Sequence, residues 1–214
     1  MREAQAIVRA TGATQPRPAP AGGRPSEADT VGLRDGSSVT VRLASAADEP
    51  ALRSFLSELC PEARRLRFFS GAANMASAAH LTSIVDSGHC GLIAHDEMGA
   101  VVGHATYVLL DPTRAEVAVE VADHLHGRGL GTILIERLAA IAEQHGITYF
   151  VAEVLAENHA MLDVFREGFD ARVVHHEGPE ERVELLTSCW RLARERFGGV
   201  GDRGQQESDT LAGA

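Results

Sequence analysis

The stretch from Arg114 to His145 constrains the fold more than any other part of the chain. It opens with strict alternation, in which Val117, Val119 and Val121 point one way and the residues between them point the other, as in a half-buried strand. It ends in apolar residues at three- and four-residue steps, the pattern of a helix. Between the two lies the glycine-rich segment HGRGLGT (126–132). Such a turn leaves polarised backbone N–H groups at a helix N-terminus, which suits a phosphate or pyrophosphate.

Lysine is absent from the chain, and all 20 basic residues are arginine. A GKS/T phosphate loop and a pyridoxal-phosphate enzyme both need a lysine, so both classes are excluded. A dinucleotide fingerprint would need a third Gly, or an Ala, where Thr132 stands. Two explanations of the missing lysine stay open: a genome of high GC content, or an advantage for a lysine-modifying enzyme that offers itself no substrate.

The remaining composition narrows the partners and the location. The net charge of -10 argues against nucleic acid or an anionic membrane surface as a partner. No apolar run approaches the ~20 residues of a membrane span, and the first residues lack the apolar core of a secretory signal. The cysteines at 60, 90 and 189 are far apart and indicate reduced thiols in a cytoplasmic protein. The histidines lack metal-ligand spacing, so we expect no metal.

The order of elements predicts one mixed α/β domain over residues 37–190. Residues 1–36 are rich in Pro, Ala and Gly and are expected to form a disordered arm. Within the domain, the pattern predicts a strand, helices, a hairpin, the strand–turn–helix stretch described above, another strand and helix, and a last hairpin. Residues 191–214 are expected to hold the end of a C-terminal helix and a flexible tail.

Several motifs together resemble the GNAT acyltransferase superfamily. Its glycine-rich pattern, Gln/Arg-x-x-Gly-x-Gly/Ala, is matched at Gly129 and Gly131, while His126 departs at the first position. With RLRFFSG, RAEVAVEVADHLHGRGLGT and FVAEVLAENHAML, the chain is similar to the Pat-type bacterial protein lysine acetyltransferases. The resemblance implies the GNAT fold, a mixed and mostly antiparallel central sheet of six to seven strands flanked by helices.

The resemblance also implies acetyl-CoA as co-substrate and a set of residues that bind it. Backbone groups of the strand would pair with the pantetheine arm, N–H groups of the glycine-rich segment would hold the pyrophosphate, and an asparagine that caps the next helix would add a contact. These residues are Val119, Glu120, Val121, Gly127, Arg128, Gly129, Leu130, Gly131, Thr132 and Asn158. Arg128 could add a charge-assisted contact to phosphate.

Glu116 is the candidate general base. It precedes Val121 by five residues, roughly 17 Å along an extended strand, which is comparable with a pantetheine arm. A carboxylate there can take the proton of an attacking amine, and the Pat-type resemblance puts its base at this position. Glu120 ranks second and Glu153 third. The alternative is a solvated strand residue paired with an arginine. Phe165 stands where many members of the superfamily carry a tyrosine that protonates the thiolate.

These observations predict an N-acetyltransferase that moves acetyl from acetyl-CoA to an amine, with a protein lysine as the preferred acceptor. The expected protein partner exposes a lysine, as an acyl-CoA synthetase could. Strand N–H groups would stabilise the oxyanion. Two alternatives stay open: a small-molecule amine acetyltransferase, and an acyl-CoA-binding regulatory module without turnover.

Overall fold

One sheet of eight strands organises the computed structural model, which describes residues 28–68, 75–86 and 88–189. The order across the sheet is β1-β2-β3-β4-β5-β6-β8-β7, and all neighbours are antiparallel except β5 and β6. The predicted class, a mixed and mostly antiparallel sheet, is confirmed, with eight strands in place of six to seven. The strands are β1 (Asp29–Gly32), β2 (Ser38–Leu43), β3 (His89–His95), β4 (Val101–Asp111), β5 (Arg114–Val121), β6 (Tyr149–Leu155), β7 (Arg172–Glu177) and β8 (Glu180–Leu186).

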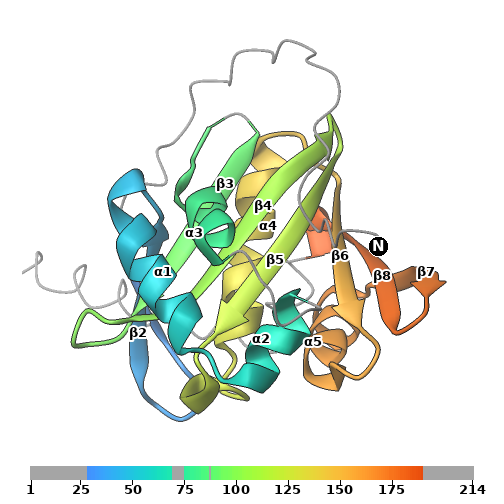
Figure 1. The fold of residues 1–214 in the computed structure, drawn as a ribbon. Coiled ribbons are helices and arrows are strands. Elements are labelled where there is room, and N and C mark those ends of the chain that lie inside the picture. Colours follow the sequence, from blue (N-terminus) through green and yellow to red (C-terminus); the bar gives the residue numbers. More distant parts are fainter. Residues whose placement is uncertain (1–27, 69–74, 87, 190–214) are drawn as a thin grey trace, which may run out of the picture.

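Helices cover both faces of this sheet (Figure 1). On one face α4 (Leu130–Gln144) packs its buried leucines and isoleucine against β4 and β5. On the other face lie α1 (Glu49–Glu58) and α3 (Met75–Ser83). The short helices α2 (Pro61–Phe68) and α5 (His159–Asp163) lie near the ends of β5 and β6 (Figure 1). These two helices therefore border the region between the parallel strands.

The alternation of β5 fits its place between two helical layers. Val117 and Val119 are buried in the cluster that α4 completes, while Glu116 and Glu120 lie on the opposite face, where Glu120 pairs with Arg67 of α2. Because the period of a strand is two, one face of β5 serves the core and the other carries the charged side chains. The predicted strand, turn and helix are all present, with α4 beginning at Leu130.

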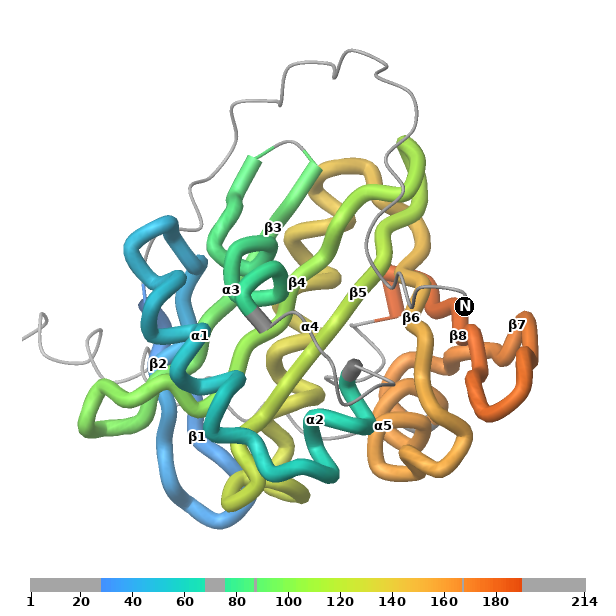
Figure 2. The backbone as a smooth tube through the Cα atoms, in the orientation of Figure 1, coloured from blue at the N-terminus to red at the C-terminus, as the bar shows by residue number. Residues whose placement is uncertain are grey.

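The fold begins earlier than residue 37, so the predicted boundary of the amino-terminal arm is wrong at its end. β1 pairs antiparallel with β2, from Asp29 opposite Val41 to Gly32 opposite Ser38 (Figure 2). Val31 is 1% exposed and joins the main core. No sequence pattern indicated this strand, because DTVG is four residues long and follows a proline-rich stretch.

Some predictions fall outside the described residues. They concern residues 1–27 of the arm, the last residue of the predicted domain, and the helix end and tail at 191–214. Among the described helices, none is long and apolar enough to cross a membrane.

Gly91 in β3 fixes how closely α3 approaches the sheet. A Cβ at this position would overlap the backbone carbonyl of Thr82 at the end of α3. We expect Gly91→Ala to lower the free energy of unfolding by about 3 kcal/mol or more, because backbone cannot turn aside as a side chain can. Urea denaturation measures the loss.

The matched control is Gly88→Ala, whose added Cβ would meet the Asp86 Oδ1 atom at an ordinary 3.6 Å. This variant should stay within about 0.5 kcal/mol of the wild type. Equal stability of the two variants would contradict the close approach of α3.

Candidate active site

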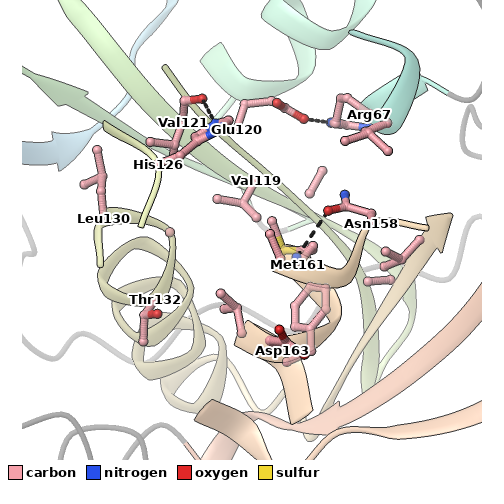
Figure 3. A pocket seen from close by; sticks show the side chains of 18 of the residues that line it. Arg67, Val119, Glu120, Val121, His126, Leu130, Thr132, Asn158, Met161 and Asp163 are labelled. Carbon is pink, nitrogen blue, oxygen red and sulfur yellow. Dashed lines mark hydrogen bonds and ion pairs between the residues drawn. The ribbon is translucent and has the colours of Figure 1, made fainter. Parts of the chain in front are cut away.

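The parallel pairing of β5 with β6 ends where the candidate site begins. Its register joins Arg114–Glu116 to Tyr149–Val151, and beyond these residues the strands part. A cavity of about 450 Å³ opens between them, with walls from both strands, the glycine-rich segment, α2 and α5 (Figure 3). Ten of the predicted site residues line it: Glu116, Val119, Glu120, Val121, Gly127, Gly129, Leu130, Gly131, Thr132 and Asn158.

The backbone of β5 turns alternate residues toward this cavity. The Ala122 N–H donates to Val102 O of the β4 side at 2.9 Å. Since backbone direction alternates along a strand, the N–H and C=O groups of Val119 and Val121 face the gap, whereas those of Glu120 face β4. Glu120 thus presents its side chain to the cavity and not its backbone, contrary to the role predicted for it.

The glycine-rich segment forms a left-handed turn at the start of α4. Gly127 and Gly129 have φ values of 72° and 91°, a region that glycine enters without strain. The first intrahelical bond runs from the Ile133 N–H to Gly129 O at 3.1 Å. The N–H groups of residues 130–132 lie ahead of that bond and carry the partial positive charge of the 15-residue helix.

His126, the position that departs from the family pattern, supports the segment from within. Its Nε2 atom lies 2.9 Å from Val121 O, and because a carbonyl only accepts, this nitrogen carries the proton and donates (Figure 3). The ring therefore ties the end of β5 to the turn that follows.

Arg128 is the predicted site residue that does not line the cavity. Its guanidinium forms an ion pair with the Asp35 carboxylate, in the turn between β1 and β2. The sequence could not reveal this contact, because Asp35 lies in the range that was expected to be a disordered arm. The predicted phosphate contact of the Arg128 side chain has to compete with this ion pair.

Glu116 lies in a partly buried, charged neighbourhood at the far end of the cavity from the glycine-rich segment. Burial raises its pKa above the ordinary value; the nearby Arg67 and Arg182 guanidiniums oppose the rise and the Glu153 carboxylate adds to it. Glu153 itself accepts a hydrogen bond from Arg182 Nε at 2.5 Å. The pKa of Glu116 is thus held above its ordinary value, as a base for an ammonium group requires.

Glu120 forms an ion pair with Arg67 of α2, with 3.3 Å between Oε1 and Nε (Figure 3). Its side chain is 11% exposed. Burial raises the pKa of Glu120 to about 8, although the Arg67 guanidinium favours the charged form. A second carboxyl group with a displaced pKa thus lies in the same cavity as Glu116.

Asn158 and Phe165 have the positions that the sequence suggested. The Asn158 side chain accepts from the Met161 N–H at 3.2 Å and caps α5, so its expected capping role is confirmed (Figure 3). Phe165 is 2% exposed and lines the cavity, where it offers no proton.

Several lining residues were not predicted from the sequence. They come from the β1–β2 turn, from α2 and from the α5 region: Arg34, Ala63, Leu66, Arg67, Met161 and Asp163. Arg67 could have been identified from the sequence, since it lies in the RLRFFSG segment of the family resemblance. No sequence motif marks Arg34.

The model of the acetyltransferase (GNAT) family matches residues 55–169, more than half of the chain. The chain belongs to the GNAT family. It is an acyltransferase, and acetyl-CoA is the acyl donor that this family uses. The predicted likeness to Pat-type proteins is confirmed by the relatives described next.

Two curated relatives are acetyltransferases. This GNAT chain is 30% identical to acetyltransferase PA5475 of Pseudomonas aeruginosa over 139 residues, which are 62% of the chain and 74% of the relative. It is 34% identical to acetyltransferase Pat of Mycolicibacterium smegmatis over 87 residues, which are 41% of the chain but only 24% of Pat.

Solved structures show the same fold. The GNAT domain of S. lividans PAT superposes with a TM-score of 0.66 at 30% identity, covering 74% of this chain and 96% of that one. Spermidine N-acetyltransferase from Vibrio cholerae, solved with CoA and spermine, has a TM-score of 0.55 at 17% identity, covering 72% and 98%. At 17% identity, the similarity to the spermidine enzyme is evidence for the fold alone. Among the described residues, no cluster of side chains could hold a metal ion.

Glu120 should make the free energy of unfolding depend on pH. Its pKa of about 8 in the folded protein exceeds the ~4.3 of a glutamate in the unfolded chain, so the folded state binds the proton more tightly. This stabilisation is complete below about pH 4 and is lost as the pH rises toward 8.

We expect Glu120→Gln to remove up to about 1.4 kcal/mol per pH unit of that decline between pH 5 and 8. Urea denaturation of both proteins across this range measures the difference. Parallel curves for wild type and variant would show that the Glu120 pKa is not raised.

Proposed function

We propose that this GNAT enzyme transfers acetyl from acetyl-CoA to the ε-amine of a lysine on another protein. The observation that carries the proposal is the cavity between β5 and β6. It has an anion-binding turn at one end and the Glu116 carboxyl at the other, roughly 17 Å away along an extended strand. That length suits a pantetheine arm between a pyrophosphate and a thioester.

The cavity fits acetyl-CoA in charge and in backbone direction. The N–H groups of residues 127 and 129–132 and the α4 dipole would hold the pyrophosphate. The outward-facing backbone groups of Val119 and the N–H of Val121 would pair with the amides of the pantetheine arm. Val121 O already accepts from His126, so the pairing would rest mainly on the other three groups.

Glu116 supplies the proton acceptor that the reaction requires. A lysine amine has a pKa near 10.4, so removing its proton at pH 7 costs about 4 kcal/mol. Because burial raises the Glu116 pKa, the carboxylate is a stronger base than an exposed glutamate. The proton would pass to Glu116 directly or through one water.

The acyl transfer itself needs little more from the chain. The neutral amine nitrogen would attack the thioester carbon, the C–N bond would form and the C–S bond would break. The proton that the nitrogen loses on becoming an amide would neutralise the departed thiolate. A backbone N–H group of β5 would donate to the developing oxyanion. Phe165 gives no proton to the sulfur, so the thiol would leave as a thiolate, which its pKa of ~8.5 permits.

A protein acceptor is supported by the relatives and by the charges of the cavity. The curated relative Pat and the S. lividans PAT domain are the similar proteins on which this choice rests. The Glu116 carboxyl group lies on the acceptor side of the cavity and would attract a cationic side chain. An acyl-CoA synthetase with an exposed lysine is our candidate partner, and we place both in the cytoplasm.

Two alternatives differ from this proposal in what the cavity does. A small-molecule amine acetyltransferase would use the same residues on a smaller acceptor. A non-catalytic acyl-CoA-binding module would need the turn and β5 but not Glu116, so the raised pKa of that buried carboxyl favours an enzyme.

Incubation with acetyl-CoA, a whole-proteome extract and a panel of small amines distinguishes these functions. Mass spectrometry should detect new acetyl-lysine on proteins in the extract. Labelling of small amines alone would contradict the protein acceptor, and binding of acetyl-CoA without any labelling would support the regulatory module.

Substitution of Glu116 tests the chemical step. We expect Glu116→Gln to lower kcat by about 10²–10⁴-fold, because an amide cannot accept the proton. The affinity for acetyl-CoA, measured by calorimetry, should change little, since the substitution leaves the turn and the backbone of β5 unchanged.

Glu153→Gln is the matched control. It removes a carboxylate from the same cavity, but one already bonded to Arg182 at 2.5 Å. We expect a fall in kcat of less than about tenfold. Equal losses in the two variants would remove Glu116 from the role of base.

A further inference from the structure

The turn between β1 and β2 is held in one shape by its own hydrogen bonds. The Leu33 N–H donates to Ser37 O at 2.7 Å. The Asp35 Oδ1 atom accepts from the Ser37 N–H at 3.1 Å and from the Ser37 hydroxyl at 2.6 Å. Residues 33–37 therefore form an ordered platform and not a loose connection.

This platform is attached to the glycine-rich segment by two contacts. The Arg34 N–H donates to Arg128 O at 3.1 Å, and the Asp35 carboxylate pairs with the Arg128 guanidinium. The backbone bond and the ion pair fix the turn on the segment just ahead of α4. The ion pair also engages the side chain that the sequence had assigned to phosphate.

The Arg34 side chain lies over the turn that opens α4. Its Nε atom is 3.4 Å, and its Cγ and Cδ atoms 3.6 and 3.7 Å, from the place that a Cβ on Gly129 would occupy. Gly129 is the N-cap of α4, and Arg34 lines the cavity. A Cβ at Gly129 would be in van der Waals contact with this side chain.

The Arg34 side chain adds a positive charge beside the N-terminus of α4. The N-terminus itself carries about half a positive charge and attracts anions. An anion held at the turn would therefore be attracted by both groups. Guanidinium and backbone N–H groups are both strong donors to phosphate oxygens.

We propose that Arg34 is a phosphate-binding residue of this enzyme and contacts the pyrophosphate of acetyl-CoA together with the glycine-rich segment. Asp35 holds Arg128 away from that role and, with it, keeps the Arg34 backbone in place. The inference rests on the proposed binding of acetyl-CoA in the cavity and deepens it.

Calorimetric titration with CoA and with 3′-dephospho-CoA tests the assignment. Arg34→Ala should weaken both ligands about tenfold and to the same extent, because both carry the pyrophosphate. Arg34→Gln, which keeps much of the stem over Gly129, should show a similar loss, so that a loss of packing cannot explain the result. Arg34→Lys should lose only a few-fold, because it keeps the charge without the planar fork.

The matched control is Arg137→Ala. Arg137 on α4 pairs with Asp29 of β1 at 2.9 Å and does not line the cavity. The Arg137→Ala variant also removes one positive charge, together with an ion pair that holds β1. It should leave both affinities unchanged. Melting temperatures of all four variants verify that each is folded.

Three outcomes would overturn the inference. Unchanged affinity in Arg34→Ala and Arg34→Gln would remove Arg34 from the site. A loss seen with CoA but not with 3′-dephospho-CoA would place the guanidinium on the 3′-phosphate and refute the pyrophosphate contact. An equal loss in Arg137→Ala would make the effect one of general charge. A wild-type protein that binds neither ligand would instead contradict the proposed function.

Discussion

The free edge of β5 beyond Glu116 is the constraint on which the candidate site depends. One edge of this strand is bonded to β4 along its length, while pairing with β6 stops after three residues. A strand edge inside a domain carries N–H and C=O groups that need partners. Here those groups face a cavity, and an extended polar chain such as pantetheine can act as the missing strand. The two helices at the strand ends and the turn before α4 border the same opening.

Electrostatics divides that opening into two halves. Around the start of α4 lie helix N–H groups, Arg34 and the paired Arg128, a region that favours anions. Around the other half lie Glu116, Glu120 and Glu153, with Arg67 and Arg182 among them. Burial, rather than repulsion alone, raises the pKa of the first two carboxyl groups. The half near α4 therefore favours the phosphates of a co-substrate, while the other half offers the Glu116 carboxyl group as a proton acceptor.

The strand–turn–helix stretch was predictable because its signals are local. Alternation, glycine spacing and helical periodicity all lie within Arg114–His145, and the family motifs led to Glu116 and Asn158. What could not be predicted depends on contacts between distant segments. β1 is too short to show a period, and its turn meets Arg128 across 93 positions of the chain. The side-chain role of Glu120 depends on Arg67 of α2, and no local pattern marks which face of β5 that helix covers.

The attachment of the β1–β2 turn to residue 128 has a thermodynamic consequence. It connects the edge strand β1 to the glycine-rich segment, where the co-substrate would bind. The stability of β1 in the sheet and the affinity for the ligand are therefore thermodynamically linked. A ligand that stabilises the segment would also protect the amides of β1 from exchange. By the same reciprocity, an interaction that detaches β1 from the sheet would lower the affinity for the co-substrate. Residues remote from the chemistry could in this way adjust how much co-substrate the enzyme holds.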